Sequence, residues 1–338
     1  MRIGKINTKN KVFIIAEIGN NHEGSFKLAK KMINKAATVG VDAVKFQTFL
    51  PEHLVSFEDQ SRLNKLRGFQ LSYEQFKELS KIAKKKGLIF FSTPLDIKSA
   101  KFLNTIQPIF KIASGDNNFY PLIDTVAKFG KSIIVSTGVA NIDEIQKVYN
   151  KILKAWSKKK KNNQNLALLH CVSSYPVPNE QANLASISYL KKFFPDVIVG
   201  YSDHTVGINA AVLSVVAGAR IVEKHFTLDK NLSDFRDHKL SADPEEMRLM
   251  VNKIREAEKM IGKEEKKSQL CEKEMNIIGR RSIAVARNLK VGTKLSSSDL
   301  TWVRPGKGFS PGNEKKIIGK QISRSLKMGE IIMKSDLK

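Results

Sequence analysis

Residues 221–227, with the sequence IVEKHFT, begin as a short apolar run and end in ionisable side chains. The preceding run of this kind, VIVGYSDHT at residues 197–205, has the same design. Continuous apolar runs of about five residues are typical of parallel strands that are buried on both faces. Runs of the same kind recur along the chain, and together with these two they predict eight strands: Val12–Glu17, Ala43–Gln47, Leu88–Ser92, Phe110–Ser114, Ser132–Ser136, Ala167–Cys171, Val197–Tyr201 and Ile221–His225.

Longer stretches with helical spacing lie between the strands. In Phe26–Gly40 and Tyr73–Gly87, apolar residues recur every three or four positions, and a glycine follows the last of them. Alternating strands and helices that reach eight units predict an α/β fold, a (β/α)8 TIM barrel. An open doubly wound sheet is the alternative. We disfavour it because no G-x-G-x-x-G motif follows the first strand.

The character of the sequence changes after Gly262. The segment GKEEKKSQLCEKEMN is charged and poor in core residues, which indicates a linker over residues 263–278. Short β-leaning runs interrupted by glycine and proline then predict a small β-rich domain over residues 279–338. The barrel would occupy residues 1–262 and carry the chemistry.

The composition excludes several classes of protein. Of the 338 residues, 41% are hydrophobic, which suits a globular enzyme, and no apolar run approaches the roughly 20 residues of a membrane span. Only two cysteines, Cys171 and Cys271, argue against a disulfide framework and favour the cytoplasm. The net charge is +25, but the lysines are scattered, and the one tight run, Lys158–Lys161, lies in a polar loop. We therefore expect a solvated surface that attracts anionic substrates, with no nucleic-acid or membrane partner.

Every predicted strand ends in, or is followed by, a side chain that can do chemistry. In a barrel these positions converge on the C-terminal face, where active sites lie, whereas an open sheet would spread them along an edge. The residues in chain order are Glu17, Lys45, Thr93, Lys111, Ser114, Ser136, Ser173, Tyr175, Ser202, Asp203, His204, Glu223 and His225.

Two histidines end consecutive strands and predict a metal site. His204 and His225 could reach a common point, with Asp203 and Glu223 alongside. Two histidines with open positions suit a divalent ion that also holds substrate or water. Since the three-His and His–Cys patterns of zinc sites are absent, a harder ion such as Mn²⁺ or Mg²⁺ is preferred, with Co²⁺ as a further alternative. Two core histidines are the competing interpretation.

The other histidines are predicted to have no ligand role. His22 and His53 are expected to be structural or surface residues, and His170, with its neighbour Cys171, is expected to lie in the core. His238 falls in a loop that is well placed to cover a substrate.

Two lysines lie in otherwise apolar strands. Because a buried lysine is costly unless it is paired, Lys45 and Lys111 are expected to be functional. One of them could be the imine-forming nucleophile of a class I aldolase. Together they could instead hold a phosphate and a carboxylate, which we favour because hydroxyl residues surround them: Thr93, Ser114, Ser136 and Ser202. Glu17 and Glu223 are candidates for proton transfer or water positioning, or else for structural hydrogen bonding.

The order of motifs along the chain resembles the sialic acid (N-acetylneuraminate) synthase family, which includes legionaminic and pseudaminic acid synthases. The barrel motifs are AEIGNNHEG from Ala16, KFQT from Lys45, STP from Ser92, KIASGD from Lys111, STG from Ser136, SSYPVP from Ser173, YSDHT from Tyr201 and EKHFT from Glu223. The runs RRSI from Arg280 and VRPGKGFSP from Val303 resemble the antifreeze-like (SAF) domain of these synthases.

This resemblance implies a reaction. Phosphoenolpyruvate (PEP) would condense with N-acetylmannosamine or a diacetamido-trideoxyhexose, giving a sialic-acid-like nonulosonic acid and phosphate. A sialic-acid-lyase type of aldolase and a non-catalytic carbohydrate-binding protein are the alternatives.

The resemblance also implies roles for named residues. Tyr175, Glu223 and Asp237 would face the sugar, and Arg304 of the partner subunit would reach its acyl-amino group, which implies a domain-swapped homodimer. Ser173 stands where some members have asparagine, and Asp116 where glutamate is usual. The metal ligands would be His204 and His225, and the PEP ligands Lys45, Thr93, Lys111, Ser114, Ser136, Ser173 and Ser202.

Overall fold

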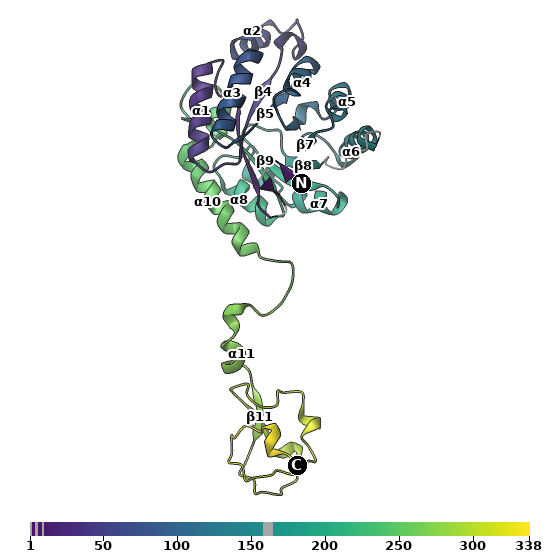
Figure 1. Cartoon of the computed structure of the whole chain (residues 1–338), viewed down its shortest axis with the longest axis vertical. Coiled ribbons are helices and arrows are strands. Elements are labelled where there is room, and N and C mark those ends of the chain that lie inside the picture. The colour runs from purple at the N-terminus through teal and green to yellow at the C-terminus, as the bar shows by residue number, and fades with distance from the viewer. Residues whose placement is uncertain (1, 4–5, 9, 158–164) are drawn as a thin grey trace. The chain divides into compact units, whose positions relative to one another are not determined.

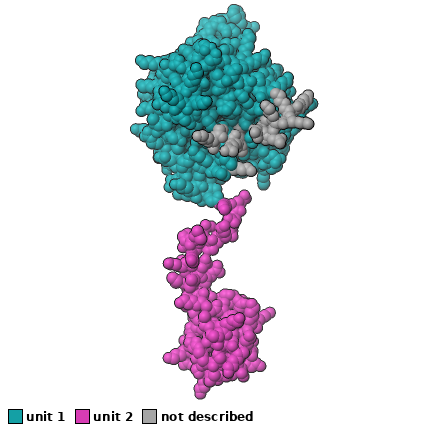
Figure 2. Space-filling model, in the orientation of Figure 1, with its two compact units in different colours: residues 1–262 teal, residues 263–338 magenta. Residues whose placement is uncertain are grey.

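The computed structural model describes residues 2–3, 6–8, 10–157 and 165–338. The lysine run predicted as a solvated loop, Lys158–Lys161, lies outside the described residues. The chain divides into two compact units, residues 1–262 and 263–338 (Figure 2), and each has its own hydrophobic core.

Eight parallel strands form one sheet within the described part of the first unit, in the order β5-β4-β3-β10-β9-β8-β7-β6. The outer strands of this order, β5 and β6, also contact each other, so the sheet curls into a barrel (Figure 1). The predicted (β/α)8 barrel is thereby confirmed. The strand bounds are β3 (Phe13–Gly19), β4 (Ala43–Thr48), β5 (Ile89–Pro94), β6 (Ile109–Ile112), β7 (Ser132–Ser136), β8 (Leu166–Cys171), β9 (Ile198–Asp203) and β10 (Ile221–His225).

A side chain bridges the seam between β5 and β6. Gln107 is buried just before β6, and its Oε1 accepts a hydrogen bond from the Ser92 backbone N–H at 2.8 Å. Its Nε2 donates to the Ser92 carbonyl at 3.2 Å. The amide therefore replaces a neighbouring strand for one residue and satisfies two backbone groups that burial would otherwise leave unpaired.

Helices cover the outside of the barrel and connect its strands (Figure 1). Both predicted helices are confirmed, and each has a serine cap that satisfies a free backbone N–H: Ser25 before the first, and Ser72 in a capping box with Gln75 before the second. Among the described residues, no helix combines the length and apolar character that crossing a bilayer requires. The helix bounds are α1 (Phe26–Thr38), α2 (Gln60–Phe69), α3 (Tyr73–Lys85), α4 (Ile97–Leu103), α5 (Tyr120–Lys128), α6 (Ile142–Ser157), α7 (Ala185–Phe193), α8 (Asn209–Val216), α9 (Asp237–Leu240) and α10 (Pro244–Ile261).

The barrel interior is apolar near the start of the strands. Phe13, Phe91 and Leu169 belong to an inner cluster of buried side chains, separate from the larger cluster between strands and helices. Ile3 joins the inner cluster from the antiparallel hairpin of β1 (Arg2–Ile3) and β2 (Ile6–Asn7). The opposite end of the barrel, where the strands finish, is left for polar side chains.

The second unit is small and turn-rich, as predicted for a SAF domain. Its antiparallel pair β11 (Ser282–Val285) and β12 (Leu300–Val303) packs on a buried apolar cluster that includes Ile317 and Ile332. The runs Leu289–Leu295 and Ile317–Ile322 make single bridges instead of strands. The segment before this core contains the short helix α11 (Met275–Ile278).

Candidate active site

A cavity of about 270 Å³ lies at the C-terminal end of the barrel strands. It gathers the residues predicted to be functional in the first unit except Asp203 and Asp237. Asp203 is fully buried elsewhere, where its Oδ2 lies 2.9 Å from the Lys224 Nζ. Strand register explains this convergence, because Glu17 is the ladder neighbour of both Lys45 and His225. The predicted residues that line the cavity are Glu17, Lys45, Thr93, Lys111, Ser114, Ser136, Ser173, Tyr175, Ser202, His204, Glu223 and His225.

Two buried lysines and two buried glutamates form the floor of the cavity. The Lys45 Nζ lies 2.8 Å from Glu17 Oε2 and 3.7 Å from Glu223 Oε2, and it donates to Thr93 Oγ1 at 2.9 Å. The Lys111 Nζ lies 3.1 Å from Glu223 Oε1. All four charged side chains are at most 6% exposed, so each charge depends on its partners for compensation.

The two glutamates differ in acidity because their surroundings differ. Burial raises the pKa of Glu17 to about 7, against the opposing effect of Lys45. Burial would also raise the pKa of Glu223, but Lys111, Lys45 and the Ser202 hydroxyl, which donates to Oε1 at 2.9 Å, lower it to about 2. Two carboxyl groups with separated pKa values can take different acid and base roles at the same pH.

Three hydroxyl groups line the wall beside this floor. The Ser114 Oγ accepts a hydrogen bond from the Gly138 N–H at 3.1 Å. A Cβ atom placed on Gly138 would lie 2.3 Å from the Ser173 Oγ and 2.7 Å from the Ser114 Oγ, so both hydroxyls crowd against this glycine. The Ser136 Oγ is buried and has no hydrogen-bond partner among the described residues. An unsatisfied buried hydroxyl next to two cations is suited to bind an anionic ligand.

The two predicted metal ligands lie side by side. The His204 and His225 rings are 5.5 Å apart, centroid to centroid. The His204 Nδ1 is bonded to the Val172 carbonyl at 2.8 Å, which leaves its Nε2 for another partner. The His225 Nδ1 is buried without a hydrogen-bond partner among the described residues, and burial lowers the pKa of this histidine, which favours the neutral form that binds metals.

This donor set fits a divalent cation with open coordination positions. In the described part of the chain, no group of three His, Cys, Asp or Glu side chains surrounds a common point. Two imidazoles would therefore leave the remaining positions to substrate oxygens or water.

Of the residues expected to face the sugar, Tyr175 and Asp237 lie at or beside the mouth of the cavity, and Arg304 lies in the second unit. The Tyr175 ring lies 4.2 Å from the His204 ring, and the Arg236 guanidinium lies 4.7 Å from the Tyr175 centroid. Asp237 does not line the cavity, but its Oδ1 lies 3.2 Å from the Arg236 Nε, which places it beside the mouth. Arg304 is exposed directly after β12 and belongs to the second unit.

Two lining residues with a polar or sulfur-containing side chain, Gln47 and Cys171, were not predicted to be functional. Gln47 donates to Glu17 Oε1 at 3.4 Å, and its position two residues after Lys45 on one strand face was an available signal. Cys171, expected in the core, is buried but lines the cavity, with its Sγ 3.7 Å from the His204 Nδ1. Gly138 does not line the cavity but packs against two hydroxyls that do, and spacing could not predict this because those hydroxyls follow different strands.

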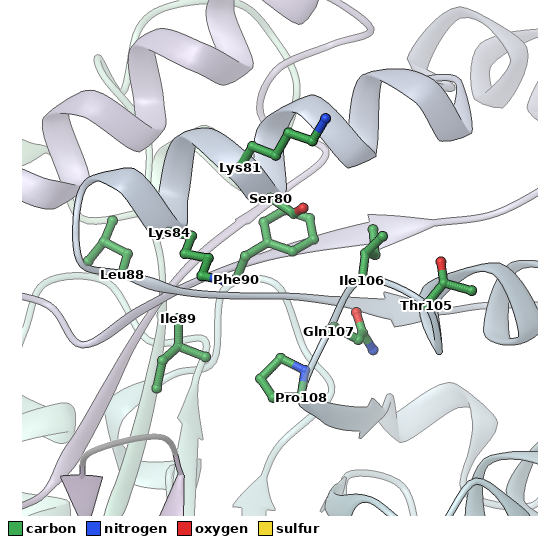
Figure 3. Close-up of a pocket in the computed structure, with 10 residues that line it drawn as sticks. All are labelled: Ser80, Lys81, Lys84, Leu88, Ile89, Phe90, Thr105, Ile106, Gln107 and Pro108. Carbon is green, nitrogen blue, oxygen red and sulfur yellow. The ribbon is translucent and has the colours of Figure 1, made fainter.

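A larger cavity, of about 600 Å³, lies near the start of β5 (Figure 3). Its Ser80 and Thr105 hydroxyls donate to backbone carbonyls, and both polar atoms of Gln107 are bonded to the backbone. Of the polar side chains that line it within the described residues, only Lys81 and Lys84 are left for a ligand. The smaller cavity, which is lined by ionisable and hydroxyl side chains, is therefore the candidate active site.

Comparisons with known proteins give a family match for each of the two units. Residues 32–266 match the model of the NeuB family, and residues 280–338 match that of the SAF domain. An uncharacterised protein of Methanocaldococcus jannaschii is 44% identical over 96% of this chain and 94% of its own length. N,N'-diacetyllegionaminic acid synthase of Campylobacter jejuni is 39% identical over 95% of this chain and 99% of its own.

A solved structure is also similar. The crystal structure of N-acetylneuraminic acid (sialic acid) synthetase from Leptospira borgpetersenii, in complex with citrate, has a TM-score of 0.76 and 35% identity. The match covers 81% of this chain and 94% of that one. Because the family model spans most of the barrel and the relatives align over almost their whole length, the chain belongs to the NeuB family of synthase enzymes and carries a C-terminal SAF domain.

Proposed function

We propose that this enzyme condenses PEP with an N-acylated amino-sugar aldehyde to give a nonulosonic acid and phosphate. The observation that carries the proposal is the pair of buried cations, Lys45 and Lys111, facing the unsatisfied Ser136 hydroxyl in one cavity. PEP carries a phosphate and a carboxylate close together, so it supplies two anionic groups to two cations. The names of the similar synthases support the same chemistry.

The proposed PEP ligands would act mainly by holding the substrate in a fixed position. Lys45 and Lys111 would neutralise the phosphate and the carboxylate, while hydroxyl groups accept or donate the remaining hydrogen bonds. Fixing the enol in this way would align its C3 with the acceptor aldehyde and lower the entropy cost of the chemical step. The full proposed PEP set is Lys45, Thr93, Lys111, Ser114, Ser136, Ser173 and Ser202.

The chemical steps form one carbon–carbon bond, add the oxygen of water to C2 and break the bond between C2 and its bridging oxygen. C3 of PEP attacks the aldehyde carbon of the open-chain sugar, and the aldehyde oxygen takes up a proton. Water then adds to C2, which has become electron-poor, and gives a tetrahedral intermediate that loses its proton. Cleavage of the bond from C2 to the bridging oxygen releases phosphate. The remaining hydroxyl proton passes to the phosphate, and C2 becomes the ketone of the keto acid.

The two glutamates would manage these protons. Glu17, with a pKa raised to about 7 by burial, can hold a proton near neutrality and give it to the aldehyde oxygen. Glu223 stays ionised beside Lys111 and Lys45, so it can orient the attacking water and accept its proton. We assign these as the acid and the base.

His204 and His225 would hold a divalent cation, for which Mn²⁺ is the preferred candidate. The buried and uncommitted Nδ1 of His225 supports this choice. When bound, such an ion supplies Lewis-acid polarisation of the sugar aldehyde. The side chains of Glu17 and Tyr175 lie around the same point and would orient the substrate there.

The acceptor sugar would lie toward the mouth. Tyr175 and Asp237 would contact its polar groups, and Arg304 of the partner subunit would reach its acyl-amino group in a domain-swapped homodimer. N-acetylmannosamine and the diacetamido-trideoxyhexoses are the candidate acceptors. Both cysteines are free, Cys171 buried and Cys271 exposed, which supports a reaction in the cytoplasm.

Phosphate release tests the proposal. The purified protein is incubated with PEP, a panel of acetamido sugars and either Mn²⁺ or EDTA. We expect phosphate release that requires both a sugar and the metal. The sugar with the highest activity identifies which nonulosonic acid the enzyme makes. No release with any acetamido sugar would overturn the proposal.

A further inference from the structure

The turn Asn20–Gly24, with the sequence NNHEG, does not line the catalytic cavity, although it directly follows Gly19, the last residue of β3. Its Asn20 Nδ2 donates to the Oε1 of the cavity residue Gln47 at 2.9 Å. Two other polar side chains of the turn, Asn21 and Glu23, bond to the segment after β10. We call this segment, residues 226–241, the acceptor loop, because it carries Arg236 and Asp237. The contacts come from two separate side chains of the turn.

Asn21 holds the two ends of the acceptor loop. It is fully buried, and its Nδ2 donates to the Phe226 carbonyl and to the Ser241 Oγ, both at 2.9 Å. The Ser241 Oγ in turn donates to the Asp237 backbone carbonyl at 2.6 Å. One amide therefore closes the loop at its base and is one hydrogen bond away from the Asp237 backbone.

Glu23 holds the middle of the loop. Its Oε1 accepts hydrogen bonds from the Ser233 Oγ at 2.7 Å and from the His238 Nε2 at 3.0 Å. His238 is fully buried, and its Nδ1 lies 2.8 Å from the Thr227 Oγ1, within the same loop. The carboxylate thus fixes both the outer part of the loop and the residue next to Asp237.

The acceptor loop places Arg236 and Asp237 at the mouth of the cavity, away from the lysines and glutamates of its floor. The Arg236 guanidinium lies over the Tyr175 ring, which packs at a tilt against the His204 ring, and Arg236 is paired with Asp237. The proposed PEP ligands come from the strands and from the turns after β6, β7 and β8. Within the described residues, the hydrogen bonds and the ion pair of Glu23 join it to Ser233 and His238 and not to those ligands.

We propose that Asn21 and Glu23 are positioning residues for the acceptor sugar, and that they act by holding the acceptor loop over the mouth. This rests on the proposed function, in which Asp237 faces the sugar. Loss of the Glu23 contacts should weaken the handling of the sugar and leave the binding of PEP unchanged. Replacing a residue that contributed only to general stability would change KM for the sugar and KM for PEP alike.

The test compares Glu23→Ala with Glu23→Gln. Glu23 has a positive φ of 46°, and both variants keep a Cβ atom there, so backbone strain is matched. Glutamine keeps an oxygen that can accept both hydrogen bonds, whereas alanine removes them. Glu74→Ala, which removes an exposed carboxylate paired with Lys77 on α3, is the control.

We expect Glu23→Ala to raise KM for the sugar about tenfold or more, since two hydrogen bonds to a charged group are lost. KM for PEP should stay within about twofold, and Glu23→Gln and Glu74→Ala should remain near wild type. Hydrogen exchange without substrate gives a second readout, because residues 228–240 should exchange faster in Glu23→Ala only.

Unchanged exchange in the acceptor loop, or an equal rise in both KM values, would overturn the proposal. Failure of the proposed function is distinguishable, because the wild-type enzyme would then release no phosphate with any sugar. The exchange measurement still tests the loop in that case.

Discussion

The wall of the cavity makes a sharp prediction at Gly138, which follows β7. An added Cβ atom would lie 2.3 Å from the Ser173 Oγ and 2.7 Å from the Ser114 Oγ. Contacts of Cβ atoms under 3.0 Å essentially never occur. In Gly138→Ala the two hydroxyls must therefore move by at least roughly 0.7 and 0.3 Å, which serine can do by rotating its side chain.

The expected effect follows from this displacement. Misplacement of a binding group by about 1 Å can cost on the order of 100-fold in rate. We expect kcat/KM for PEP to fall about 10- to 100-fold, equivalent to about 1.4 to 2.7 kcal/mol of transition-state stabilisation. The fold should survive, because the φ of Gly138 lies outside the left-handed region and the clash is with side-chain atoms that can move.

The assay is steady-state phosphate release against PEP concentration at saturating sugar, with melting temperature as the check on folding. Gly115→Ala is a matched control. Gly115 lines the same cavity and also lacks a positive φ, but nothing lies within 4 Å of its added Cβ atom. Equal kcat/KM values for the two variants would refute the assignment of this wall to PEP.

Three further predictions concern buried ionisable groups. His225→Ala should weaken Mn²⁺ binding at least about tenfold, measured by the electron paramagnetic resonance signal of the free ion, and unchanged binding would remove this histidine from the metal site. Burial lowers the pKa of His22 from 6.5 to about 4, so the unfolded chain takes up the proton first. The neutral, buried His22 therefore makes its full contribution to the free energy of unfolding above pH 6.5. About 3 kcal/mol of that contribution is lost as the pH falls to 4. His22→Asn should lose that much less stability over this range in urea unfolding, and an identical pH dependence would contradict the assignment. Borohydride treatment with pyruvate should leave Lys45 and Lys111 unmodified in peptide mass spectra, even though burial lowers the pKa of Lys111. An adduct would favour the aldolase alternative.

The barrel could be predicted because its strands are continuous apolar runs. The bounds shifted where a polar residue ends a strand: β6 stops at Ile112, since Ser114 begins a turn that the sequence placed in the strand. Helix α2 was missed because it buries only Leu63 and shows no apolar period. The hairpin of β1 and β2 is too short for any pattern to reveal.

The site could be predicted to the extent that strand ends define it. Lys45, Glu17 and Glu223 meet because parallel strands in register bring their ends together. Asp237 lies on the acceptor loop instead, and its position depends on contacts between distant turns that no local period encodes.

The fate of the bridging oxygen of PEP tests the central claim most directly. PEP labelled with ¹⁸O between C2 and phosphorus is converted with the best acceptor sugar, and mass spectrometry measures the ¹⁸O content of the released phosphate and of the keto acid. Attack of water at C2 predicts that the label leaves with the phosphate. Label retained in the keto acid would mean that water attacks phosphorus, and the assignment of Glu223 to a water at C2 would be wrong.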